Sequence, residues 1–207
     1  MISGVSATDV GTKALIRRAA LTAFAERGYS GASIRAVAAA AGVSHGLVQR
    51  HYGNKEGLRA AVDAFVVERA AELLAPVQPL APADPHDFAR GVNTALMAVA
   101  HADPDVLRYL LRTLVEGGPS AQFIFDGLMA ITRGIVDALV AAGRFRPELD
   151  ATWGSVQILM LNLGPLVLRP LLEPHLEHPL MSDEGLGEWQ GANATLALHG
   201  MLSGRTT

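Results

Sequence analysis

Residues 33–58 read SIRAVAAAAGVSHGLVQRHYGNKEGL, and this stretch decides the fold that the sequence predicts. Ser33 is a suitable N-cap for a short helix whose apolar residues recur at helical spacing. Gly42 suits the left-handed turn that ends this helix, and Ser44 suits the cap of a third, brief helix. Asn54 is placed to cap a fourth. Two short helices joined by a glycine turn predict a helix-turn-helix.

The rest of the chain continues the helical pattern and predicts an all-α protein. Of the 207 residues 50% are hydrophobic but only 5% are aromatic, which favours packed helices over a β-sandwich. Asp103 and Asp150 are further capping acids, and Gly143 is a further stop signal. The predicted helices outside the opening stretch are 12–27, 85–101, 104–116, 120–142, 150–168 and 183–202. The proline- and histidine-rich residues 169–181 are predicted to form an exposed loop.

A cluster of prolines divides the chain into parts. Pro76, Pro79, Pro82 and Pro85 lie within ten residues. We therefore predict a helix-turn-helix domain, a connecting helix and a larger helical domain, over residues 1–54, 55–75 and 76–207.

The charge is distributed unevenly between the two ends of the chain. Residues 1–60 hold eight Lys and Arg against three acids, a net charge of +5, whereas the remainder carries −8. A basic head on an acidic body is typical of a polyanion-binding domain joined to a second domain, although a solvated helix face can look the same.

Three cations stand at the start of predicted helices, where the helix macrodipole disfavours them by about 0.3–1 kcal/mol each. They are Arg35, His45 and Lys55. Free backbone N–H groups and a cation together bind a phosphate well, so DNA would explain the mismatch. The alternative is that these side chains point into water, but three in 21 residues favour the DNA interpretation.

The third helix is the predicted reader of DNA bases. Val48 and Tyr52, spaced i and i+4, are expected to face the domain core. The opposite face then presents His45, Gly46, Gln49 and Arg50. Glutamine pairs with adenine, and arginine or histidine donates to guanine or phosphate. Gly46 weakens the helix by up to about 1 kcal/mol, which close approach of the backbone to a base or phosphate would compensate; the alternative is that a glycine is tolerated so near the helix start.

These residues resemble those of the tetracycline-repressor (TetR) family of transcriptional regulators over residues 12–66. The resemblance is carried by Ala19-Ala20-Leu-Thr-Ala-Phe24-Ala-Glu26-Arg-Gly28-Tyr29, by Ser33-Ile34-Arg35-Ala-Val37-Ala38 with Ala41-Gly42-Val43-Ser44, and by His51-Tyr52-Gly53-Asn54-Lys55-Glu56-Gly57-Leu58. It implies a cytoplasmic repressor, active as a homodimer, that leaves a palindromic double-stranded DNA operator when a small-molecule effector binds. The DNA-binding residues we predict are Ser33, Arg35, Ser44, His45, Gly46, Leu47, Gln49, Arg50, His51 and Lys55.

The third helix departs from the family pattern. Leu47-Val48-Gln49 stands where the family usually has Thr-Leu-Tyr, so a common backbone contact is lost and Leu47 is placed to meet a thymine methyl group. The alternative function is therefore a helical interaction or ligand-binding protein with weakened DNA binding.

The resemblance also implies that the body dimerises and encloses an effector pocket. An apolar stripe compatible with a dimer seam, or with ordinary core, comprises Trp153, Val156, Leu159, Met160 and Leu163. Candidate pocket residues, each of which is alternatively a surface or core residue, are Asn93, Met97, His101, Leu107, Arg108, Leu111, Arg112, Phe123, Phe125 and Met129. This set favours an apolar or amphipathic effector.

The sequence gives no support for an enzyme, a cofactor or a metal site. It contains no cysteine, no phosphate-binding loop, no G-x-S-x-G elbow and no H-E-x-x-H motif. His175 and His178 have acidic neighbours, but we interpret this segment as a solvated loop. The first ten residues do not resemble a signal peptide, and the longest apolar run, Trp153 to Leu168, is short for a bilayer span, so no membrane association is predicted.

Overall fold

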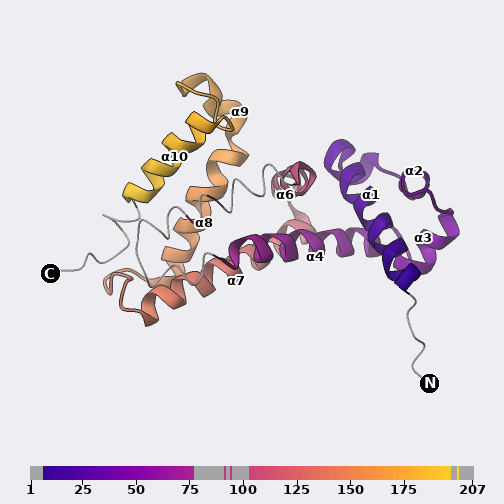
Figure 1. The fold of residues 1–207 in the computed structure, drawn as a ribbon, viewed down its shortest axis with the longest axis horizontal. Coiled ribbons are helices and arrows are strands. Elements are labelled where there is room, and N and C mark those ends of the chain that lie inside the picture. Colours follow the sequence, from indigo (N-terminus) through magenta and orange to yellow (C-terminus); the bar gives the residue numbers. More distant parts are fainter. Residues whose placement is uncertain (1–6, 77–90, 92–93, 95–102, 197–199, 201–207) are drawn as a thin grey trace. The chain divides into compact units, whose positions relative to one another are not determined.

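The computed structural model describes the chain except for residues 1–6, 77–90, 92–93, 95–102, 197–199 and 201–207 (Figure 1). The described residues form helices and no β-strand. In chain order these are α1 (Ala7–Gly31), α2 (Ile34–Ala40), α3 (His45–Tyr52), α4 (Lys55–Leu74), α6 (Pro104–Glu116), α7 (Gly118–Ala141), α8 (Ala151–Val167), α9 (Arg169–Leu172), the 3₁₀ turn η2 (Glu173–His175) and α10 (Asp183–Leu196). The predicted all-α fold is confirmed.

The chain forms two compact units, which we call the head unit and the body unit. The head unit comprises residues 1–68 and 103–124, and the body unit comprises residues 69–102 and 125–207. The first turns of α4 and the whole of α6 therefore belong with the helix-turn-helix. The predicted domains, with limits at residues 54 and 75, are continuous segments of the chain. Each compact unit instead combines two segments that are separated in the sequence.

The core of the head unit forms where α1 packs against α2 and α6, and α2 against α3, with buried side chains of α4. Fully buried side chains from α1, α3 and α4 include Ile16, Leu21, Phe24, Val48, Leu58 and Val62. α6 joins this core through Tyr109, which is 2% exposed and whose ring lies 6.3 Å from that of Phe24. Asp103 and Asp105 at the start of α6 form salt bridges with Arg18 of α1. α6 is thus held to α1 by apolar and ionic contacts.

The body unit contains a second core around the end of α7. Ile135, Val136, Leu139 and Phe145 are buried there, and partly buried apolar side chains from α4 and α8 pack against them. The ring of Phe145 lies so close to Gly154 of α8 that a Cβ atom at residue 154 would be 2.4 Å from it. α10 is linked to α8 by a hydrogen bond from Asn193 Nδ2 to the Leu161 carbonyl, 3.3 Å long.

The predicted helix ends agree with the structure at the start of α6, at both ends of α8 and at the start of α10, whereas α1 begins at Ala7, five residues before the predicted start, and continues to Gly31 across a kink at Gly28. Asp103 and Asp150 cap α6 and α8 through their carboxylates, and Ser182 accepts a hydrogen bond from Gly185 N at the start of α10. Gly143 follows the end of α7 with a φ of 63°. The predicted helix over residues 85–101 lies largely outside the described residues.

One predicted segment is wrong. Residues 169–181 were expected to form a loop, but they begin with α9 and η2. The proline at position 170 stands in the first turn of α9, where its missing N–H costs nothing, so the prolines here do not exclude helix. The side chains are nevertheless largely at the surface, with Leu171 70% exposed.

No single helix among the described residues combines the length and apolarity needed to cross a membrane. α8 taken together with the segment Arg169–His175 meets that criterion only as a pair bent by 69°. Leu159, Leu163 and Leu166 of α8 are buried, as in an ordinary core helix.

Candidate nucleic-acid interface

Capping groups fix the start of α2 and the turn between α2 and α3. The Ser33 hydroxyl accepts a hydrogen bond from Ala36 N at 3.1 Å, and the Ser44 hydroxyl accepts one from Leu47 N at 3.2 Å. Gly42 has a φ of 67°, which lets the N–H of Val43 reach back to the Ala38 carbonyl at 3.0 Å. Both serine caps and the left-handed glycine, predicted from the sequence, are confirmed.

α3 has one face in the core and one at the surface, as predicted. Val48 is fully buried, and the Tyr52 hydroxyl donates to the carbonyl oxygen of Lys13 on α1 at 2.7 Å. Leu47 is half-buried. The exposed residues of this helix are His45, Gly46, Gln49 and Arg50, and Ser44 precedes them at the surface.

The three cations predicted at helix starts differ in their surroundings. Arg35 and His45 are exposed. Lys55 is half-buried, because its Nζ lies 4.4 Å from the centre of the Tyr29 ring. All three therefore remain available for a polyanion, and Lys55 also has a fixed neighbour.

His51 differs from the other predicted contact residues. Its side chain is only 7% exposed, and its Nε2 lies 3.4 Å from an Asp9 carboxylate oxygen without forming a hydrogen bond. The structure thus places His51 beneath α1 rather than at the open surface.

Three further residues that we did not select shape this surface. A Cβ atom at Gly57 would lie 2.1 Å from the Tyr52 carbonyl oxygen, so a glycine is needed where α4 begins against the end of α3. Lys13 is exposed, and its Nζ lies 5.7 Å from the Tyr52 ring. Arg59 joins Lys55 at the Tyr29 ring. Gly57 could have been identified from the sequence, because a glycine is unusual near the start of a helix. The position of Lys13 could not, because it depends on the packing of α1 against α3.

Seven of the ten predicted pocket residues lie among the residues that the structure describes. Leu107, Arg108, Leu111, Arg112 and Phe123 lie in the head unit, where Arg108 and Arg112 pair with Asp105 and Glu116. Phe125 and Met129 lie in the body unit and are half-buried. Asn93, Met97 and His101 lie outside the described residues.

The predicted dimer stripe separates into two sets. Leu159 and Leu163 are 6% and 8% exposed and belong to the core of their own chain, and Val156 is half-buried. Trp153 and Met160, one heptad apart on α8, are 66% and 43% exposed. Only this second pair is available to a partner without rearrangement.

Comparison with known proteins matches both halves of the chain to one family. Residues 16–62 match the bacterial regulatory proteins of the tetR family, and residues 102–203 match a tetracyclin repressor-like C-terminal domain. The chain is 32% identical over 160 residues to the HTH-type transcriptional repressor Rv3405c of Mycobacterium tuberculosis, an alignment that covers 77% of this chain and 74% of that protein. The chain belongs to the TetR family.

Other TetR-family proteins agree with this assignment. The HTH-type transcriptional regulatory protein RaaS of M. tuberculosis is 35% identical over 142 residues, which cover 69% of this chain and 63% of that protein. The chain thus spans less than two thirds of that relative. A putative TetR-family regulator from Mesorhizobium loti has the same fold, with a TM-score of 0.72 at 17% identity over 94% of this chain and 98% of that one. Membership in a family of transcriptional regulators supports the prediction that the chain is not an enzyme.

The described residues also contain no group of three or more histidine or acidic side chains able to hold a metal ion. His178 instead lies with its Nδ1 2.9 Å from a Glu188 oxygen. This contact raises the pKa of His178, chiefly through the hydrogen bond to the carboxylate.

Proposed function

We propose that this TetR-family protein is a homodimeric transcriptional repressor that binds a palindromic DNA operator through α3. In this proposal a small apolar or amphipathic molecule bound in the body releases it from DNA. The observation that carries the proposal is the surface of α3, where exposed Gln49 and Arg50 stand opposite a fully buried Val48.

The capping geometry supports a DNA interface. At both Ser33 and Ser44 the hydroxyl is already used as an N-cap, so these residues set the helix ends that would approach phosphates. Exposed His45 directly follows Ser44, and exposed Arg35 is the second residue after Ser33. Phosphate contacts of this kind position a protein on the duplex, and base contacts from α3 supply sequence preference.

Selection of bound duplexes from a random DNA pool, at a stated salt concentration, tests the proposal directly. We expect a short inverted repeat with half-sites about one helical turn apart, because a two-fold dimer presents two copies of α3. Recovery of nothing above background would favour the alternative, a helical ligand-binding or interaction protein with weakened DNA binding.

Two substitutions then separate positioning from base reading. Lys55→Ala should weaken binding to all DNA and reduce the slope of log affinity against log salt by about one for each head. Gln49→Ala should relax preference at one base pair, at a cost of about 1–3 kcal/mol on the preferred sequence. If neither variant changes affinity for DNA, α3 is not the reader.

The exposed apolar surface of the body unit supports the proposed dimer. Trp153 and Met160 of α8 and Leu196 of α10 are all exposed. Met160 and Leu196 also line a groove of about 590 Å³ between these helices, together with Trp189. A second copy would remove this surface from water.

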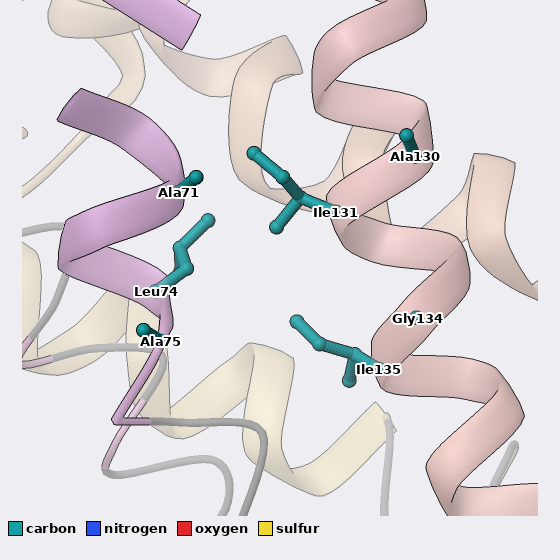
Figure 2. A pocket seen from close by; sticks show the side chains of 7 residues that line it. All are labelled: Ala71, Leu74, Ala75, Ala130, Ile131, Gly134 and Ile135. Carbon is teal, nitrogen blue, oxygen red and sulfur yellow. The ribbon is translucent and has the colours of Figure 1, made fainter. Parts of the chain in front are cut away.

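A small cavity in the body unit supports an apolar effector (Figure 2). Leu74 of α4 and Ile131 and Ile135 of α7 point toward one another across it. Its volume is about 200 Å³, and its lining is completed by Ala71, Ala75, Ala130 and Gly134. No polar side chain belongs to this set, so the described wall would select an apolar group by shape alone.

A further inference from the structure

Tyr29 gathers two cations at the start of α4. Lys55 Nζ and Arg59 Cζ each lie 4.4 Å from the centre of its ring. The two residues are four apart on α4 and therefore share a helix face. Both distances are within the range in which a cation is attracted to the face of an aromatic ring.

The backbone at Gly28 and the ring of Phe24 fix the position of the Tyr29 ring. Gly28 has a φ of 73°, a backbone conformation that favours glycine and turns the chain away from the axis of α1. The ring then lies 5.7 Å from that of Phe24, which is 1% exposed. A side chain anchored to the core in this way offers Lys55 a fixed surface.

The ring holds the Lys55 ammonium without neutralising it. Among the described residues no carboxylate lies within salt-bridge distance of Lys55. The nearby acid, Glu56, accepts a hydrogen bond of 2.8 Å from the Tyr29 hydroxyl. That hydrogen bond is the largest cause that lowers the pKa of Glu56, and the charge of Lys55 lowers it further, so the carboxylate stays at the hydroxyl of the ring although it lies near the ammonium.

This arrangement has a consequence for anion binding. A carboxylate paired with Lys55 would have to be displaced before a phosphate could bind, at the cost of one ion pair. An aromatic face attracts the ammonium through its quadrupole and leaves the formal charge and the outward N–H donors free.

We propose that Tyr29 is a positioning residue of the DNA interface, whose ring face holds the Lys55 ammonium ready for a backbone phosphate at the start of α4. This inference rests on the proposed function, since Lys55 has its role on DNA only there. It adds to that function a residue that touches no base and no phosphate.

The test is a double-substitution cycle on the full-length protein. The variants are Tyr29→Leu, Tyr29→Phe, Lys55→Gln and the Tyr29→Leu/Lys55→Gln pair, and the readout is affinity for the selected operator duplex at several salt concentrations. Tyr29→Leu should weaken binding about two- to fivefold for each head, the range expected for an exposed cation–π contact. Tyr29→Phe keeps the ring face but frees the Glu56 carboxylate, and should bind more tightly than Tyr29→Leu. In the Lys55→Gln background, Tyr29→Leu should have no further effect.

A second series keeps the shape of the ring and changes only its charge distribution. Protein variants with increasingly fluorinated phenylalanine at position 29 should bind DNA progressively more weakly when Lys55 is present. In the Lys55→Gln background, all members of the series should bind DNA with the same affinity. A purely structural role for Tyr29 predicts no dependence on fluorination in either background. That result, or tighter binding on fluorination, overturns the inference.

Failure of the inference and failure of the proposed function give different results. If the wild type selects no duplex, the proposed function fails. If the wild type binds the operator and Lys55→Gln lowers its affinity, but the fluorinated variants at position 29 all bind with the same affinity, only the positioning role of Tyr29 fails.

Discussion

At the scale of single residues, a buried acid joins α4 to α6 within the head unit. Asp63 is 4% exposed, and its Oδ1 accepts a hydrogen bond of 2.5 Å from the Tyr109 hydroxyl. Ser120 and Arg59 also favour its ionised form. Buried polar groups of this kind are costly to leave without partners, so the pair should control how well α6 is held.

Tyr109→Phe should destabilise the protein by about 1–3 kcal/mol, because it removes one hydrogen-bond donor from the buried carboxylate of Asp63. Tyr52→Phe is the matched control. Its hydroxyl bonds to a backbone carbonyl at a less buried site, and its loss should cost about 0.5–1.5 kcal/mol. Urea unfolding of both variants measures the difference, and equal losses would contradict the importance of the Asp63 pair.

Burial also gives Asp63 a defined effect on the pH dependence of stability. Desolvation raises the pKa of Asp63 above its ordinary value of 3.8, so the folded chain keeps this proton over a range in which the unfolded chain has lost it. The stability from this group is fully present below the ordinary pKa and is lost as the pH rises through the raised pKa.

Asp63→Asn removes this titration. The free energy of unfolding of the variant should therefore improve relative to the wild type as the pH rises above the ordinary pKa of an aspartate, as measured by urea unfolding at several pH values. Parallel curves for the two proteins would show that Asp63 does not titrate in this range.

At the scale of elements, two glycines of the head unit have opposite structural roles. A Cβ atom at Gly46, inside α3, would meet no atom within 4 Å. Gly28 has a positive φ, and a Cβ atom there would lie 2.7 Å from a guanidinium nitrogen of Arg112. The backbone conformation at position 28 therefore needs a glycine, whereas nothing in the free protein needs one at position 46.

Gly46→Ala should raise the free energy of unfolding by up to about 1 kcal/mol, because alanine is the better helix former, yet it should weaken DNA binding if the backbone approaches DNA there. Gly28→Ala is the comparison and should destabilise the protein by about 1 kcal/mol or more. Thermal unfolding and operator titration together check both. An alanine at position 46 that stabilises the protein and leaves DNA affinity intact would show that no close contact forms there.

At the scale of the whole molecule, dimerisation decides how many reading helices meet one operator. Trp153 is the most exposed of the predicted dimer residues, and a large exposed indole is unusual on a surface that stays in water. The proposed dimer explains it by burial against a second copy.

Trp153→Glu should shift the protein toward monomer and weaken operator binding, since a charge would be buried at the seam. Leu171→Glu, at a 70% exposed position on α9, is the control and should leave the mass unchanged. Light scattering after size-exclusion chromatography measures both. A monomeric wild type, or a Trp153→Glu dimer, would contradict this placement of the seam.

The sequence alone determined the local features of this protein. The caps at Ser33 and Ser44 and the turn at Gly42 depend on backbone groups only a few residues away, and so the helix-turn-helix could be predicted from residue order. Only the tertiary structure decided the long-range contacts. It turned Leu159 and Leu163 inward while leaving Trp153 exposed, and brought Asp63 to Tyr109 and Lys55 to Tyr29. Helical periodicity identifies an apolar face, but which neighbour covers that face depends on packing between segments far apart in the chain.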